Sequence, residues 1–235
     1  MEISDKFKLV LKTINYNFKI VFAGYFVYFL IAAVLFYLTV IGIMLFSGAS
    51  PDDGDIYNTL LFPGILTIFY PVIFAVQHDK DTRMLEIVFG IPNYRYKVYL
   101  VRFAITILLL IFVLSGMTIV AYFSVVKIQI AKMVIQLIYP LLFISTLAFL
   151  MATLIKNGNG AAVVMVVIGL IFWFLSEPLS SSKWNLFLNP FHIPNQMNSI
   201  IWESIIKQNR LILCIGALIA MLWGMINLQQ REKFV

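Results

Sequence analysis

Long apolar runs, separated by short polar segments, dominate the chain. Most of these runs approach the roughly 20 residues that an α-helix needs to cross about 30 Å of hydrocarbon. The six runs cover residues 21–45, 60–76, 101–125, 134–155, 161–175 and 211–228. Because backbone polar groups in lipid must bond within their own segment, the pattern predicts an all-α, polytopic membrane protein with six transmembrane helices.

The second and fifth runs are shorter than the others. The second contains Pro63 and Pro71, and each proline removes one helix hydrogen bond. The fifth can extend into residues 177–179. Both runs therefore suit a bent helix or a partial crossing.

The composition excludes a water-soluble fold. Of the 235 residues, 62% are hydrophobic and 12% are charged, whereas a soluble domain usually carries about 25% charged residues. A soluble domain of this size buries only about 70 to 75% of its unfolded surface, so its core could not hide so many apolar side chains. Lipid must be the solvent of most of the chain.

The distribution of basic residues predicts the orientation. Of the 17 Lys and Arg residues, twelve fall on the side of the two termini and five on the other side, which also carries the acidic loop 51–55. Basic residues are enriched on the cytoplasmic side of membrane proteins. We therefore expect both termini to be cytoplasmic, with the chain in the plasma membrane of a bacterium or archaeon.

Residues 1–19 show a different periodicity, that of an amphipathic helix. Apolar and basic side chains recur at three or four residues on opposite faces, which is typical of a helix lying in the membrane interface. The residues expected to form this interfacial helix include Phe7, Lys8, Lys12, Ile14 and Phe18.

Residues 177–209 form a long outer segment that is too apolar for a freely solvated loop. Its aromatic side chains, such as Trp184 and Trp202, favour the membrane interface. We expect one or two short helices that dip into the outer leaflet, interrupted at Pro190 and Pro194.

The six runs contain essentially no ionisable side chain away from their ends, where Arg102 and Glu177 lie. Neither a metalloprotease motif nor a nucleophile-elbow motif is present, and His78 and His192 are far apart. The sequence predicts no catalytic residue, metal site or cofactor in this chain. Proton-coupled transport is also disfavoured because proton relays use buried ionisable groups, although sodium coupling through hydroxyl and carbonyl oxygens stays open.

Residues 78–97 form a cytoplasmic connector between the second and third runs. The connector is a mixed charged and apolar segment up to Gly90, which suits a helix end, and Pro92 stops the helix. The pattern is compatible with a simple connecting loop or with a short surface helix that docks a partner.

The connector resembles the signature region of type-2 ABC permeases, in which a charged stretch leads into Thr-Leu-Glu-like residues, a proline and a basic, aromatic start of the next span. The matching residues are Asp81, Arg83, Met84, Leu85, Glu86, Ile87, Pro92, Tyr94 and Arg95. Arg83-Met84 replaces the usual Gly-Thr. The resemblance extends to the N-terminal amphipathic helix, the six spans and Asn189-Pro190 before the last run.

This resemblance implies that the whole chain, 1–235, is one transmembrane permease domain of an ABC exporter. The connector, residues 78–97, would act as a coupling helix that docks on a separate cytoplasmic ATPase, with Arg83 and Glu86 as polar anchors and Leu85 and Ile87 as apolar contacts. The chain has no phosphate-binding loop of the Gly-x-x-x-x-Gly-Lys-Ser/Thr type. ATP and Mg are therefore expected on two partner ATPase subunits, beside a second permease subunit that is either a copy or a different chain.

Two other functions remain open at this point. One is an ion-coupled secondary carrier, and the other is a non-transporting membrane scaffold that recruits a partner through the connector. The substrate is not predicted, because an apolar pathway suits lipids, peptides, drugs and glycan precursors alike.

Two local patterns concern packing. Gly216, Ala220 and Gly224 place small residues at every fourth position of the last run, which allows close helix approach. Residues 157–160 predict a tight turn between the fourth and fifth runs.

Overall fold

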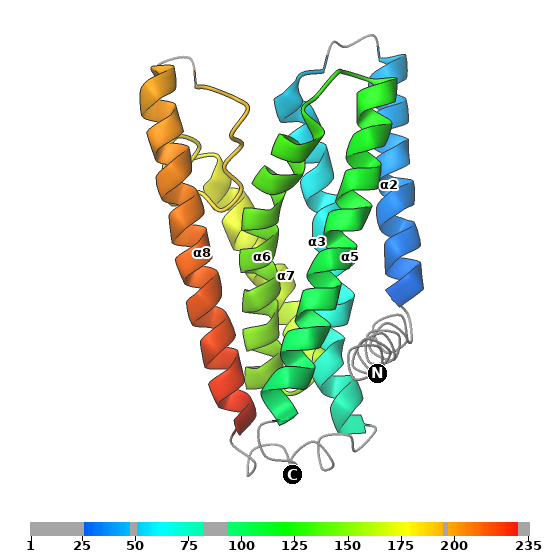
Figure 1. Ribbon diagram of the computed structural model, residues 1–235, viewed down its shortest axis with the longest axis vertical. Helices are drawn as coiled ribbons and strands as arrows, with labels where there is room; N and C mark the ends of the chain where they lie inside the picture. The colour runs from blue at the N-terminus through cyan, green and yellow to red at the C-terminus, as the bar shows by residue number, and fades with distance from the viewer. Residues whose placement is uncertain (1–25, 48–50, 82–93, 195–196, 230–235) are drawn as a thin grey trace, which may run out of the picture.

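The computed structural model describes residues 26–47, 51–81, 94–194 and 197–229. In these ranges the chain forms six α-helices and no strand (Figure 1). The helices are α2 (Phe26–Phe46), α3 (Asp53–Asp81), α5 (Tyr94–Ser124), α6 (Ile130–Ile155), α7 (Gly158–Ser176) and α8 (Ser199–Gln229). All six are long and apolar enough to cross a membrane. The prediction of an all-helical, multi-pass membrane protein is confirmed.

Two predicted features lie outside the described residues. These are the interfacial helix 1–19 and most of the proposed docking residues, namely Arg83, Met84, Leu85, Glu86, Ile87 and Pro92. Asp81 is the last residue of α3 and Tyr94 is the first of α5. Both helices therefore continue into the borders of the connector.

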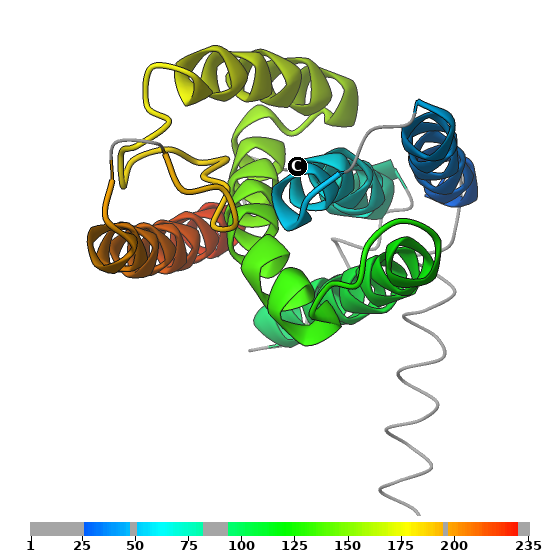
Figure 2. The same ribbon diagram turned by 90° about the horizontal axis from the view of Figure 1, so that it is seen from above.

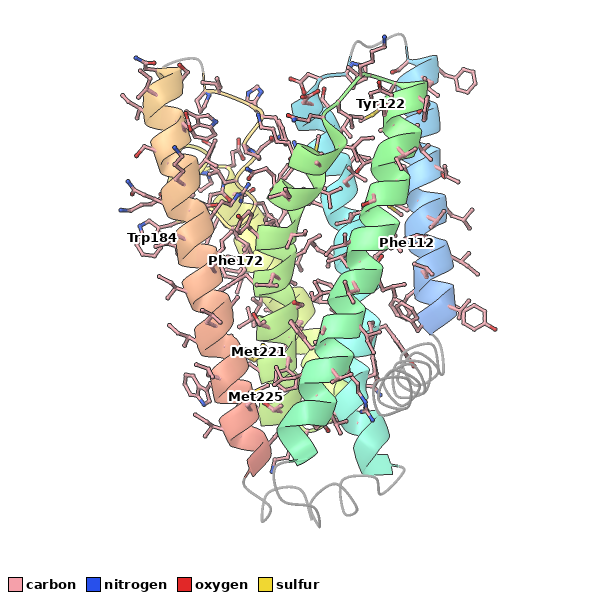
Figure 3. All side chains as sticks on the ribbon, in the orientation of Figure 1. Phe112, Tyr122, Phe172, Trp184, Met221 and Met225 are labelled. Carbon is pink, nitrogen blue, oxygen red and sulfur yellow. The ribbon has the colours of Figure 1, made fainter. Side chains whose placement is uncertain are left out.

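The helices α3 and α6 occupy the middle of the bundle. Helices α2 and α5 pack on α3, α7 packs on both central helices, and α8 packs mainly on α6 (Figure 2). Phe172, Met221 and Met225 lie between helices, whereas Phe112 projects outward (Figure 3). Large apolar side chains remain exposed on the outer faces of α2, α7 and α8, as expected for surfaces that contact lipid.

Helix α3 is longer than its apolar run predicted. It has 29 residues and passes without interruption through Pro63 and Pro71. It starts at a reciprocal pair of hydrogen bonds: Asp55 N donates to Asp52 Oδ1 at 2.8 Å, and Asp52 N donates to Asp55 Oδ2 at 3.1 Å. This capping box satisfies backbone donors that the first helical turn leaves free, so helix formation begins before the apolar run.

Helix α8 also begins earlier than predicted, at Ser199 instead of residue 211. The last part of the expected outer segment 177–209 therefore belongs to the final helix. Residues 177–194 form turns, and the expected short helices before the last span are not found in the described part of this segment. We call residues 177–194 the cap segment. The bundle end that holds the α2–α3, α5–α6 and α7–α8 connections is the capped end.

At the opposite end, α6 and α7 are joined by the predicted tight turn. Lys156 closes α6 in the left-handed conformation, with φ 59°, and its N–H donates to Ala152 O. Asn157 caps α7, because its side-chain oxygen accepts from Asn159 N at 2.9 Å and Gly160 N at 3.2 Å. Gly158 N donates to Gln77 Oε1 at 2.6 Å, which ties the turn to α3.

Replacing Asn157 with alanine should lower the free energy of unfolding by about 1 kcal/mol, because the first backbone N–H groups of α7 lose their acceptor. Thermal unfolding of the purified chain in detergent measures this loss. Asn159→Ala is the matched control, since the Asn159 side chain is exposed on the same turn. Equal unfolding temperatures for the two variants would show that the cap contributes nothing.

The small residues of α8 face α6. A Cβ atom added to Gly216 would lie 2.7 Å from the Phe143 ring, and one added to Gly224 would lie 2.8 Å from the Phe149 ring and 3.5 Å from Leu150 Cα. Ala220, between them in the stripe, is also buried. The stripe therefore packs helix against helix within this chain.

Candidate functional site

The most unusual side chain in the described structure is Arg210 on α8. It is 6% exposed although it lies in a helix that can span a membrane. Its Nε donates to Gln136 Oε1 on α6 at 2.8 Å, and its Nη1 donates to Asn209 Oδ1 at 3.0 Å. Its Nη2 donates to Leu188 O on the cap segment at 3.2 Å and to Tyr57 Oη on α3 at 3.4 Å. One guanidinium thus joins α3, α6, α8 and the cap segment.

All of these hydrogen-bond partners are neutral. They are an amide side chain on α6, a neighbouring amide, a phenol and a backbone carbonyl. The Tyr139 ring lies 5.7 Å from the guanidinium carbon, which adds a cation–π contact. Neutral polar groups and the face of the Tyr139 ring therefore stabilise this charge, and none of its four hydrogen-bond acceptors is a carboxylate.

Asn209 attaches the cap segment to α8. It is 1% exposed, and its Nδ2 donates to Lys183 O at 2.9 Å and to Asn185 O at 2.8 Å. Asn185 in turn donates to Ser176 O at the end of α7. These bonds satisfy backbone carbonyls of the cap segment and of the end of α7, which lie outside the regular hydrogen bonds of a helix.

A third asparagine attaches the cap segment to α3. Asn189 Nδ2 donates to Gly54 O at 2.9 Å, and a Cβ at Gly54 would lie 3.1 Å from that same nitrogen. The glycine therefore permits the close approach. Beside this contact the Phe191 ring lies 5.9 Å from the Tyr57 ring, and Lys132 Nζ lies 5.5 Å from the Phe191 centroid.

The sequence did not predict this cluster. The apolar run that begins at residue 211 makes Arg210 look like the flank of a span, whereas the helix starts at Ser199. A usable signal was present: no glycine or proline occurs from residue 195 to residue 215, so nothing in the sequence interrupts a helix before Arg210. Of the two boundary residues that were predicted, Arg102 is buried on α5, 5.8 Å from the Tyr99 ring centroid, and Glu177 is exposed.

The predicted sites are not brought into one cluster. The Gly216–Gly224 stripe of α8 packs against α6, and the backbone of Asp81 and Tyr94 belongs to the borders of the connector. Within the described ranges, no group of three or more His, Cys, Asp or Glu side chains could hold a metal ion.

No protein-family model, curated protein or solved structure matches this chain.

Proposed function

We propose that this chain is the membrane-spanning permease subunit of an ABC exporter, coupled to a separate cytoplasmic ATPase. The observation that carries the proposal is the connector between α3 and α5, whose sequence resembles the docking segment of type-2 ABC permeases. In this arrangement both termini and the connector face the cytoplasm. Two ATPase subunits would bind ATP and Mg, and a second permease subunit would complete the pathway.

The helices beside the connector support this reading. Helix α3 continues to Asp81, beyond the end of its apolar run at residue 76, and α5 begins at Tyr94, ahead of the apolar run that starts at residue 101. A force applied to the connector would therefore act on two continuous helices. Because α3 packs on α2, α5, α6 and α7, its displacement would reposition most of the bundle as packed elements.

The buried charges favour an external energy source. Among the described residues the buried ionic side chains are Arg102 and Arg210, and an arginine does not lose its proton in proteins. Neither can serve as a proton carrier. An ion-coupled carrier would then have to use sodium bound by hydroxyl and carbonyl oxygens, and it would transport without ATP. A scaffold would bind a partner without nucleotide-dependent movement.

Affinity purification of the tagged full chain in mild detergent tests the proposal. We expect an ATPase with a phosphate-binding loop to co-purify, and Glu86→Arg to reduce its recovery about tenfold or more, because charge reversal in a docking contact costs several kcal/mol. Transport-coupled ATP hydrolysis should fall with it.

Glu177→Arg makes the same charge change in an exposed residue at the capped end, and it should leave ATPase recovery unchanged. If no ATPase is recovered in several detergents, or if Glu86→Arg recovers as much ATPase as the unmodified chain, the permease proposal fails and the carrier or scaffold takes its place.

A further inference from the structure

The hydrogen bonds of Arg210 differ in length from one end of the guanidinium to the other. The bonds from Nε and Nη1 measure 2.8 and 3.0 Å, whereas the two bonds from Nη2 measure 3.2 Å to Leu188 O and 3.4 Å to Tyr57 Oη. Charge-assisted N–H···O bonds are usually about 2.7 to 2.9 Å long. Nη2 is therefore the weakly bonded end of the cation.

Donors outnumber acceptors at this place. The Tyr57 hydroxyl oxygen accepts a hydrogen bond from Arg210. The O–H group of Tyr57 itself has no acceptor among the described residues. Tyr57 is 0% exposed, so water does not readily replace that acceptor. The second N–H of Nη1 likewise has no recorded acceptor among the described residues. A buried donor without an acceptor is costly.

The charge at this place is also uncompensated by its hydrogen-bond partners. A buried charge is expensive to keep without an oppositely charged partner, so a guanidinium held by neutral groups alone favours an anion-binding role. The planar guanidinium matches carboxylate and phosphate groups. An additional cation, exposed Lys132, lies on the Phe191 ring, which in turn contacts Tyr57.

We propose that Arg210 and Tyr57 form an oxyanion-binding site at the capped end. The ligand is the carboxylate or phosphate group of an amphiphile, or the same oxyanion free in solution. One of its oxygens takes the place of Leu188 O on Nη2 and accepts the Tyr57 hydrogen, and the cap segment shifts to admit it. Exposed Lys132 attracts the anion to the rim. The site is remote from the connector along the chain, and it does not depend on the permease assignment.

Ligand-dependent thermal unfolding of the full chain in neutral detergent tests this proposal. The probes are dioctanoyl phosphatidylglycerol, its neutral counterpart dioctanoyl phosphatidylcholine, and sodium phosphate at constant ionic strength. We expect a saturable rise in unfolding temperature with an anionic probe and none with phosphatidylcholine. A rise with phosphate alone identifies a free oxyanion as sufficient, and a rise only with phosphatidylglycerol identifies a lipid headgroup as the source.

Two variants separate this site from general attraction between charges. Arg210→Gln should abolish the response, whereas Lys207→Gln should keep it, since Lys207 is exposed on the same helix and pairs with exposed Glu203. Tyr57→Phe retains the cation, so it remains informative if Arg210→Gln fails to fold. It should raise the half-saturating concentration about tenfold or more, because one hydrogen bond to the anion is lost.

The proposal is overturned if neither anionic probe raises the unfolding temperature of the unmodified chain. It is also overturned if Arg210→Gln keeps the full response, or if Tyr57→Phe titrates like the unmodified chain. In that event Arg210 is solely a structural link between the cap segment and the bundle.

Discussion

Replacing Asn209 with leucine should lower the free energy of unfolding by about 3 kcal/mol or more. The amide of Asn209 donates to two backbone carbonyls of the cap segment and accepts from Arg210. Leucine has the same number and branching of side-chain heavy atoms but no polar atom. The variant would leave Lys183 O and one charged N–H group of Arg210 without these hydrogen bonds, and Asn185 O would keep only the 3.4 Å bond from Leu188 N. Each lost bond to a group shielded from water carries a desolvation cost. Thermal unfolding in detergent measures the change.

Gln208→Leu is the control for this experiment. Gln208 precedes Asn209 and is exposed, and its hydrogen bond to Ser204 measures 3.5 Å at the surface. We expect its unfolding temperature to stay close to that of the unmodified chain. Similar losses in both variants would mean that the helix tolerates leucine poorly in this region and that the cap contacts are not responsible. Limited proteolysis within residues 177–194 should be faster only in Asn209→Leu.

Gly224→Leu should have the second large effect, a loss of about 3 kcal/mol. The added Cβ alone would lie 2.8 Å from the Phe149 ring, and the α6 backbone at Leu150 Cα is 3.5 Å away. Turning the ring aside does not create room for a whole leucine side chain, because the backbone of α6 limits the space. We expect α8 to separate from α6, with a lower unfolding temperature in detergent.

Gly169→Leu is the matched substitution on α7. No heavy atom lies within 4 Å of a Cβ at this position, and leucine is favoured over glycine in a helix by up to about 1 kcal/mol. The unfolding temperature should therefore remain the same or rise. If Gly224→Leu is as stable as Gly169→Leu, the close packing of α8 on α6 is incorrect.

The number and type of the elements follow from the sequence alone. A chain with six long apolar runs and few charges has one compatible solvent, lipid, and in lipid each run must satisfy its backbone groups as a helix. The turn at residues 157–160 was also predictable, because the Asn157 side chain accepts hydrogen bonds from the backbone N–H groups of Asn159 and Gly160, two and three residues later. These features depend on local composition and on short-range hydrogen bonds.

The starts of α3 and α8 were not predicted correctly, for a common physical reason. An apolar run indicates which part of a helix is surrounded by lipid. The helix can continue beyond that run if its polar residues form hydrogen bonds. The Asp52–Asp55 capping box allows this at α3. At α8 the extension contains Asn209 and Arg210, whose partners are residues of other elements of the fold.

The burial of Arg210 is decided by the tertiary structure. Its partners Tyr57 and Gln136 stand 153 and 74 positions away in the chain, and Leu188 stands 22 positions away. The residue itself looks like an ordinary basic flank of a span. Such a charge can be solvated by water, paired with a lipid headgroup or buried among hydrogen-bond acceptors. Which of these occurs depends on the packing of α3, α6 and the cap segment. Hydrogen bonds of this kind form only between groups that packing has already brought together. The sequence alone determined that the chain forms six helices long and apolar enough to cross a membrane, and the packing of those helices decided that Arg210 is buried among them.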